Sequence, residues 1–150
     1  MRGVHNSVMA THVALLRGIN VGGRNKVAMT DLRTMVTGLG FASVSTYIQS
    51  GNVLLSTTNN DENTIAEAIA GGLSKTFGLD VGVVVVSRDR LAEVISRNPY
   101  PGEANPKCLH AVFLTAEPSP ERLGRLAAVQ AAKGGRDSVT AVGFWVAGVR

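Results

Sequence analysis

Residues 44–57, VSTYIQSGNVLLST, decide the fold of this chain. Val44–Gln49 is β-branched and aromatic, and Asn52–Thr57 has the composition of a second strand. Ser50-Gly51 between them is a turn signal. The stretch therefore predicts a β-hairpin, and the order of the other elements follows from working outward on both sides.

Upstream of the hairpin, His12–Ile19 is largely apolar and predicts a short strand. A glycine-rich polar loop follows over Asn20–Ala28, and Gly40 is suited to ending a helix. Between them, apolar residues recur at the spacing of a helix. These residues are Met29, Leu32, Met35, Val36 and Leu39.

Downstream, Asn60 or Asp61 can cap a second helix, and Val81–Val86 predicts a buried strand. Gly71 and Gly72 weaken that helix by about 1 kcal/mol each relative to alanine. The first half thus has the order β-α-β-β-α-β, for which the usual solution is a ferredoxin-like plait. The apolar stripe of the second helix is Ile65, Ile69, Leu73 and Phe77.

The second half repeats the beginning of this order. Ser87 can cap a short helix with apolar positions at Leu91, Val94 and Ile95, and the proline-rich stretch Asn98–Pro106 cannot continue it. A strand over Leu109–Thr115 and a helix capped by Ser119-Pro120 follow. A second hairpin closes the chain, over Ser138–Val142 and Phe144–Val149.

The chain is therefore expected to be an α+β protein of two ferredoxin-like (βαββαβ) lobes, the second lacking its final helix and strand. The expected division is a disordered leader over 1–10, a first lobe over 11–87, a helix and proline-rich connector over 88–106, and an incomplete second lobe over 107–150. The strings HVALL and HAVFL, which begin the two copies, indicate a weak internal duplication, with chance similarity of short strands as the alternative. Met9 is the expected natural start.

Composition excludes several classes of protein. The chain has 150 residues, of which 45% are hydrophobic, and a net charge of +4, which does not fit a disordered tail. Its one cysteine, Cys108, excludes an internal disulfide and a multi-cysteine zinc site, and fits the cytoplasm. No apolar run is long enough for a membrane span. The absence of a Lys/Arg run does not favour nucleic acid as a partner, although nothing excludes it. Neither a metal nor a cofactor is expected.

Topology predicts one candidate site. In the plait, the loop after the first strand and the turn of the hairpin lie at the same end of the sheet, beside the start of the first helix. Glycines, cations and amides at a helix N-terminus have the composition of an anion cradle. In the alternative interpretation, the glycines only form turns and the asparagines only satisfy loop backbone. The predicted binding residues are Arg17, Asn20, Gly22, Gly23, Arg24, Lys26, Gln49, Ser50 and Asn52.

Other motifs are not supported. The spacing from Gly18 resembles a P-loop, but Arg24 and Asn25 stand where that motif needs Lys and Ser or Thr. An RNA-recognition module needs aromatic residues on its sheet, and neither His12–Ile19 nor Asn52–Thr57 has one. His12 and His110 have no metal-ligand spacing, and no catalytic residue can be assigned.

Two strings carry a resemblance to a known family. They are VALLRGINVGGRNKV at Val13–Val27 and TYIQSGNV at Thr46–Val53. The chain resembles the uncharacterised bacterial family called domain of unknown function 1697. The resemblance implies two ferredoxin-like lobes and brings no reaction. Family members usually run on past the strand matching Phe144–Val149, so this strand is expected to be an exposed edge, open to pairing with another chain.

Three functions are consistent with these patterns. The first is a module that binds a small anion, a phosphate or nucleotide, at the predicted site. The second is a phosphate-ester or acyl-phosphate hydrolase, by analogy with ferredoxin-like acylphosphatases, with Arg17 or Arg24 and Asn52 or Asn20 in the same cradle. The third is an interaction module without a small ligand, in which two copies pair through the edge of the C-terminal hairpin.

Overall fold

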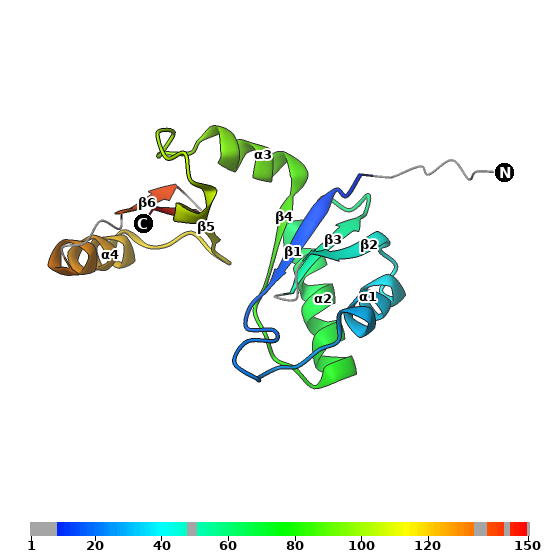
Figure 1. Cartoon of the computed structure of the whole chain (residues 1–150). Coiled ribbons are helices and arrows are strands. Elements are labelled where there is room, and N and C mark those ends of the chain that lie inside the picture. The colour runs from blue at the N-terminus through cyan, green and yellow to red at the C-terminus, as the bar shows by residue number, and fades with distance from the viewer. Residues whose placement is uncertain (1–8, 48–50, 134–137, 143–144, 150) are drawn as a thin grey trace. The chain divides into compact units, whose positions relative to one another are not determined.

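The structure is a computed structural model that describes residues 9–47, 51–133, 138–142 and 145–149. The chain divides into two compact units, Met1–Ala92 and Glu93–Arg150, and the division falls inside the connector expected over 88–106. Each unit contains one antiparallel sheet (Figure 1). The described residues form four α-helices and seven strands, so the chain is an α+β protein. None of these helices has the length and the apolar character needed to cross a membrane.

The first unit has the element order expected from the sequence. Its four strands are each antiparallel to their neighbours and lie in the order β2-β3-β1-β4. The predicted hairpin is confirmed, because β2 and β3 pair directly. The elements are β1 (His12–Leu16), α1 (Met29–Gly38), β2 (Ala42–Tyr47), β3 (Asn52–Ser56), α2 (Glu62–Phe77) and β4 (Val83–Ser87).

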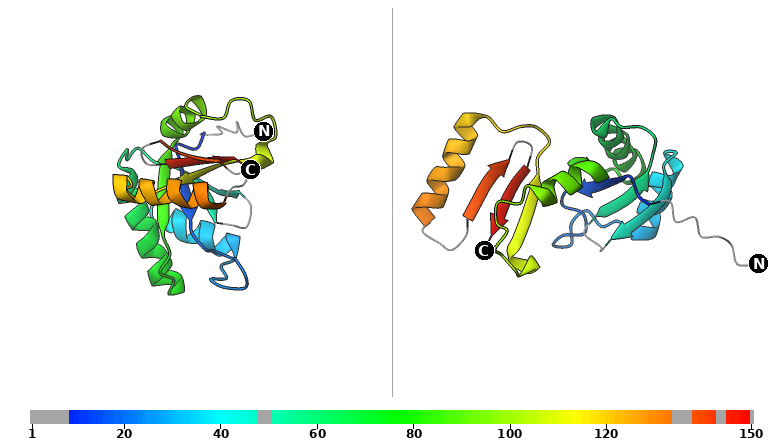
Figure 2. Two further views of the ribbon diagram at one scale, coloured as in Figure 1. Left: turned by 90° about the vertical axis from the view of Figure 1, so that its left-hand side faces the viewer. Right: turned by 90° about the horizontal axis from the view of Figure 1, so that it is seen from above.

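The sheet of the first unit has two different faces, because successive side chains of a strand point in opposite directions. Ala14 and Leu16 of β1 are buried in the core that α1 and α2 complete on one face (Figure 2). Val13 and Leu15 are only half-buried and point to the other face, which α1 and α2 do not cover and which we call the open face. The core also contains Val53, Leu55, Val83 and Val85 from the sheet, with Leu32, Met35, Val36, Ile65, Ile69 and Leu73 from the helices.

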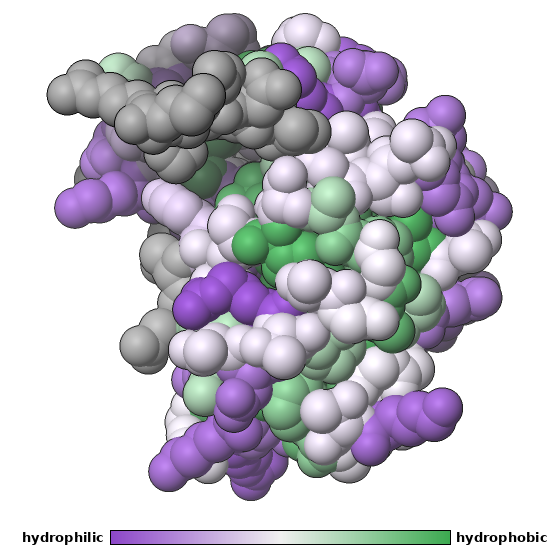
Figure 3. Space-filling model, turned by 90° about the vertical axis from the view of Figure 1, so that its right-hand side faces the viewer, coloured by the Kyte–Doolittle hydropathy of each residue, from purple (hydrophilic) through white to green (hydrophobic). Residues whose placement is uncertain are grey.

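The core reaches the surface along the edge strand β2. Phe41 and Val44 are partly buried against the core, and Leu39 at the end of α1 is exposed. Figure 3 views the molecule from the side on which β2 and α1 lie in Figure 1, and shows hydrophobic side chains at the surface between hydrophilic ones.

The two glycines of α2 have different surroundings. A Cβ atom on Gly72 would lie 2.5 Å from the Sδ atom of Met35, whereas a Cβ on Gly71 would meet nothing within 4 Å. Gly72 therefore allows α2 to approach α1 closely, which the sequence did not predict. Asp61 is the residue that caps α2, since its side chain accepts from the backbone N–H groups of Asn63 and Thr64.

Helix α3 (Arg88–Ser96) follows β4 directly, and the division between the units falls within it. Ser87 acts as its predicted cap, because its Oγ accepts from the backbone N–H of Arg90 (3.2 Å). Leu91 lines a small hollow of about 100 Å³ on the open face of the first sheet, together with residues that include Val13, Leu54 and Val86. The first turn of this helix therefore lies over one end of that face.

The second unit contains a three-stranded sheet in the order β5-β7-β6. Trp145 is 6% exposed and belongs to a core cluster with Val94, Tyr100 and Phe113. Helix α4 lies beside β6 (Figure 2). The elements are η1 (Pro106–Cys108, a 3₁₀ helix), β5 (Leu109–Phe113), α4 (Pro120–Lys133), β6 (Ser138–Val142) and β7 (Trp145–Val149).

The expectation that the last strand is an exposed edge is wrong. β7 pairs with β6 on one side and with β5 on the other, so it is the middle strand of its sheet. The reason is that β7 pairs with β5, which is distant from it in the sequence, just as β3 pairs with β1 in the first unit. Among the described residues of the second unit, the outer strands are β5 and β6. Pairing of two copies through the hairpin stays a prediction, and β6 is the strand it would use.

Candidate functional site

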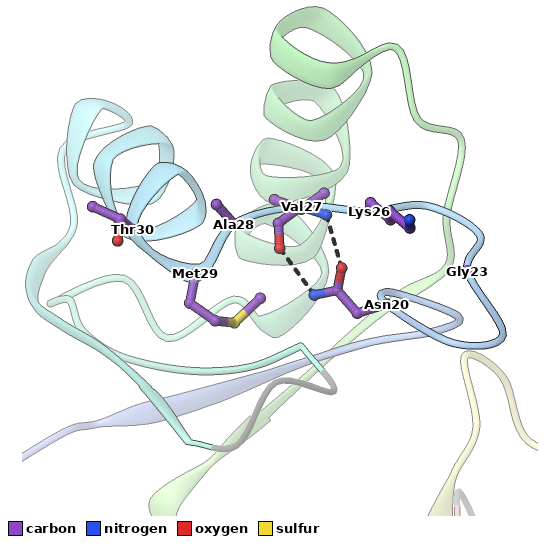
Figure 4. A pocket seen from close by; sticks show the side chains of 7 residues that line it. All are labelled: Asn20, Gly23, Lys26, Val27, Ala28, Met29 and Thr30. Carbon is purple, nitrogen blue, oxygen red and sulfur yellow. Dashed lines mark hydrogen bonds between the residues drawn. The ribbon is translucent and has the colours of Figure 1, made fainter.

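The glycine-rich loop between β1 and α1 is held in shape by two asparagines. Asn20 donates from Nδ2 to the carbonyl oxygen of Val27 (2.9 Å), and its Oδ1 accepts from the N–H of Val27 (2.8 Å; Figure 4). Asn25 donates from Nδ2 to the carbonyl oxygen of Gly18 (3.1 Å). Both asparagines have a positive φ, 55° and 51°, which this residue type tolerates better than most. The Asn20 amide therefore positions the loop.

The tip of this loop is a tight turn. The N–H of Arg24 donates to the carbonyl oxygen of Val21 (3.0 Å), and the two residues form an isolated β-bridge. Gly22 and Gly23 between them have φ values of 59° and 74°. Two successive positive φ values are what a type I′ turn requires, and glycine meets that requirement without steric cost. All four residues are exposed, so the tip is open to a ligand.

The start of α1 has no capping side chain. Its N-cap residue is Ala28, which makes no side-chain hydrogen bond to the helix, in contrast to Asp61 at the start of α2. The first N–H groups of a helix have no partner within the helix and carry a partial positive charge. An open hollow of about 650 Å³ lies against this helix start. Its lining residues are Asn20, Gly23, Lys26, Val27, Ala28, Met29 and Thr30 (Figure 4).

Three cations belong to the loop. Arg17, Arg24 and Lys26 are exposed, and none of them takes part in the ion pairs found among the described residues, which are Arg90–Glu62, Arg97–Glu93 and Arg125–Glu121. Asp31 in the first turn of α1 is the acidic residue at this helix start. The local charge is therefore positive, and Lys26 is the cation that lines the hollow.

The hairpin turn meets the start of the loop, as the topology predicted. Leu16 donates from its N–H to the carbonyl oxygen of Gly51 (3.1 Å). A Cβ atom on Gly51 would lie 3.1 Å from the Cβ of Leu16 and 3.2 Å from the Cβ of Ile19. Gly51 therefore fits against the loop because it lacks a side chain. Gln49 and Ser50, the predicted binding residues of this turn, lie outside the described residues.

Asn52 lies on the open face of the sheet, and the register places an aromatic residue beside it. Tyr47 of β2 is directly opposite Asn52 of β3, and its side chain is 66% exposed. Sequence reasoning looked for aromatic residues on the two central strands and missed this one on the edge strand. Its position follows from the register of the hairpin, which could not be derived from the sequence pattern.

Other reactive side chains do not form a second site. Cys108 is half-buried and His110 is exposed, and no cluster of three metal-ligating residues occurs in the part of the chain that the structure describes. His12 is 4% exposed; its Nδ1 lies 2.8 Å from the Oγ1 of Thr11. Its Nε2 has no hydrogen-bond partner among the described residues. This buried histidine belongs to the interior.

Comparisons with known proteins give a family and a fold. A family model described as "Protein of unknown function (DUF1697)" matches residues 9–144. The solved structure of the conserved bacterial protein SP0830 from Streptococcus pneumoniae is similar, with a TM-score of 0.76 and 22% identity over 95% of this chain and 77% of that chain. No curated protein matches. At 22% identity the likeness to the pneumococcal protein is one of fold, and it brings no ligand or reaction.

Proposed function

Since the chain belongs to the DUF1697 family, whose description gives no reaction, we propose from its own geometry that it binds a small anion bearing a phosphate group at the start of α1. The observation that carries this proposal is the helix start without a capping side chain, which lies against a hollow of about 650 Å³ that Lys26 lines. Arg17 and Arg24 on the same loop add positive charge that no described carboxylate neutralises.

Each part of this arrangement has a physical role in holding a phosphate. The free N–H groups of Met29 and Thr30 supply donors, and the helix dipole favours negative charge there. Lys26 contributes a charge-assisted hydrogen bond. Gly23 lets the backbone of the loop come close to a ligand. Asn20 holds the loop in place through Val27 and is a positioning residue in this proposal.

Thermal unfolding with inorganic phosphate and pyrophosphate tests the proposal. We expect either anion to raise the Tm of the full chain, because a ligand that binds only the folded state stabilises it. Lys26→Ala and Arg17→Ala should each weaken the affinity on the order of tenfold, the effect of losing one charged hydrogen bond. Isothermal titration calorimetry measures the affinities directly.

Arg88→Ala is the matched control for the loss of one charge. By the register of β1 and β4, Arg17 lies opposite Gly82 at one end of the ladder and Arg88 lies opposite Thr11 at the other. We expect Arg88→Ala to bind phosphate as the unchanged chain does. An equal loss in all three variants, or no stabilisation by either anion, would contradict the proposal.

We further assign both units to the ferredoxin-like architecture. The support is the order β2-β3-β1-β4 in the first sheet, together with the βαββαβ element order and both helices on one face. In the second unit the order β5-β7-β6 matches the arrangement of β1, β3 and β2. For its location we propose the bacterial cytoplasm, which the free thiol of Cys108 supports, since reducing compartments keep thiols unpaired.

Hydrolysis of an acyl phosphate or phosphate ester is a second candidate function. The observation that favours it is that Asn52 of β3 is opposite Leu15 of β1, and Arg17, whose N–H donates to the carbonyl oxygen of Gly82 just beyond the end of β1, is two residues farther along the chain. A cation that holds a phosphate and an amide that orients a water would be the roles of these two residues. Release of phosphate from acetyl phosphate by the unchanged chain, lost in Asn52→Ala, is the expected result; absence of turnover contradicts it.

A further inference from the structure

We propose that the open face of the first sheet is a stacking platform for the base of a nucleoside phosphate, with Tyr47 as the side chain on which the base stacks. This inference rests on the proposed function in one respect. Arg17, one of the three cations of the proposed anion site, holds the phosphate of the same ligand. The inference adds the chemical class of the rest of the ligand, which the anion site by itself does not specify.

The platform is a row of four residues that crosses the whole sheet. Tyr47 pairs with Asn52, Asn52 pairs with Leu15, and Leu15 pairs with Val84. Residues directly opposite one another on neighbouring antiparallel strands have Cβ atoms about 4.5–5.5 Å apart. The four side chains therefore form a continuous strip, which starts at the edge strand β2 and ends at β4.

The row lies on the face that α1 and α2 do not cover. Thr46, the neighbour of Tyr47, points to the helices, where its Oγ1 accepts from Nη1 of Arg33 in α1 (2.8 Å). Val53, the neighbour of Asn52, is fully buried in the core. Since side chains alternate along a strand, Tyr47 and Asn52 point away from the helices.

The chemistry of the row suits a flat ring with polar edges. Tyr47 is 66% exposed, and Leu15 and Val84 provide a half-buried apolar floor. The side-chain amide of Asn52 is half-buried; it carries a donor and an acceptor, and neither bonds another of the residues that the structure describes. Bases are recognised by stacking on aromatic rings and by hydrogen bonds to their edges, and this row offers both.

A cation lies next to the row on the same face. Arg17 follows β1, which ends at Leu16, and its N–H donates to the carbonyl oxygen of Gly82 (2.9 Å). The pairing with β4 thus continues by one residue, and the alternation of side chains puts Arg17 on the face of Leu15. It is exposed, and its cross-strand neighbour is Gly82, where even a Cβ atom would lie 3.9 Å from the Cβ of Arg17. Because Gly82 has no side chain, there is room beside it for the guanidinium group of Arg17. Its positive charge complements the phosphate of a ligand whose base rests on Tyr47.

The platform holds one base and not a strand. Proteins that bind single-stranded nucleic acids stack successive bases on several aromatic residues. Among the described residues of the first sheet, Tyr47 is the one aromatic side chain on the open face. The ligand is therefore a mononucleotide.

Calorimetric titration of the full chain with adenosine 5′-monophosphate, ribose 5-phosphate, inorganic phosphate and adenosine tests this inference. We expect the nucleotide to bind on the order of tenfold more tightly than ribose 5-phosphate, because stacking of a base on an aromatic ring contributes about that much. Tyr47→Ala should reduce the nucleotide to the affinity of ribose 5-phosphate. Tyr47→Phe is the matched control and should retain the difference, since it keeps the ring.

The outcomes separate this inference from the proposed function. Equal affinities for the nucleotide and ribose 5-phosphate overturn the platform and leave the anion site in place. Adenosine binding as tightly as the nucleotide overturns the anion site and leaves the platform. If none of the three phosphates binds, both proposals fail. An oligonucleotide that binds far more tightly than the mononucleotide, and does so equally in Tyr47→Ala, overturns the assignment to a single base.

Discussion

Asn20 and Val27 are joined by two hydrogen bonds that run in opposite directions. One goes from Nδ2 of Asn20 to the carbonyl oxygen of Val27 (2.9 Å) and the other from the N–H of Val27 to Oδ1 of Asn20 (2.8 Å). Val27 is 5% exposed, so these two backbone groups belong to a largely buried residue. A single side-chain amide therefore fixes the loop immediately before α1 begins.

Replacing this amide should cost both stability and binding. We expect Asn20→Ala to lower the free energy of unfolding by about 1–3 kcal/mol, since it leaves buried backbone groups unpaired. It should also weaken phosphate binding. Urea unfolding measures the first effect. The matched control is Asn25→Ala, which also has a positive φ but loses one exposed hydrogen bond. Equal losses in the two variants would show that the pair with Val27 has no special role.

The junction between the hairpin turn and the loop depends on Gly51. Gly51→Ala should destabilise the chain by about 1–3 kcal/mol, because the new methyl group would press on Leu16 and Ile19. Its φ of 86° adds strain. Gly23→Ala is the control, because its φ of 74° is also positive but its surroundings are open. Thermal unfolding of both variants separates steric pressure from backbone strain, and a larger loss at Gly23 would contradict the packing argument.

The order of the elements could be predicted from the sequence because it depends on local patterns. Apolar spacing located α1 and α2, and Ser50-Gly51 located the hairpin between them. The sequence pattern predicts that β1 ends at Ile19, because Ile19 is apolar, whereas β1 ends at Leu16 in the structure. Ile19 is indeed buried, but Gly18 has already turned the chain away from the sheet with a φ of 74°. Burial by itself does not identify a strand.

What the sequence could not provide depends on partners that are distant along the chain. The central position of β7 is set by its pairing with β5. The position of Tyr47 on the open face follows from its register with Asn52, across a turn whose length decides which residues are opposite. The convergence of the hairpin turn and the loop was predictable, because it needs only the strand order. The exposure of Tyr47 was not.

The two adjacent glycines of α2 give opposite predictions. Gly71→Ala should stabilise the chain by up to about 1 kcal/mol, since alanine favours a helix and the site is open. Gly72→Ala should destabilise it by about 1–3 kcal/mol, because its methyl group would overlap the Sδ of Met35. Adding Met35→Ala should recover part of that loss. Urea unfolding of the single and double variants tests this coupling, and stabilisation by Gly72→Ala would refute it.

The buried ring of His12 predicts that a polar residue can be removed without loss. Its Nε2 makes no hydrogen bond to any described residue, and such a group costs about 1–3 kcal/mol to bury. We therefore expect His12→Leu, which is similar in volume, to leave the free energy of unfolding unchanged or to raise it. Thr11 keeps its hydrogen bond from the N–H of Thr57 in this variant. A clear loss of stability in urea would show that the imidazole makes a favourable interaction in the interior.

The cap of α2 predicts how stability responds to acid. The backbone N–H of Thr64, its side chain and the N–H of Asn63 donate to the Asp61 carboxylate and hold its pKa below the ordinary value of 3.8. A carboxylate whose pKa is lower in the folded than in the unfolded chain contributes stability that is fully present above 3.8. That contribution is lost as the pH falls through the folded-state pKa.

The variant Asp61→Asn keeps an oxygen that can accept the same hydrogen bonds, but this side chain does not titrate. Between pH 5 and 3, the urea midpoint of unfolding of this variant should therefore fall less than that of the unchanged chain. Asp80→Asn, which removes a carboxylate from the segment before β4, serves as the control for the change in net charge. If Asp61→Asn and Asp80→Asn follow the same acid profile, the cap of α2 does not contribute to the acid sensitivity of the chain.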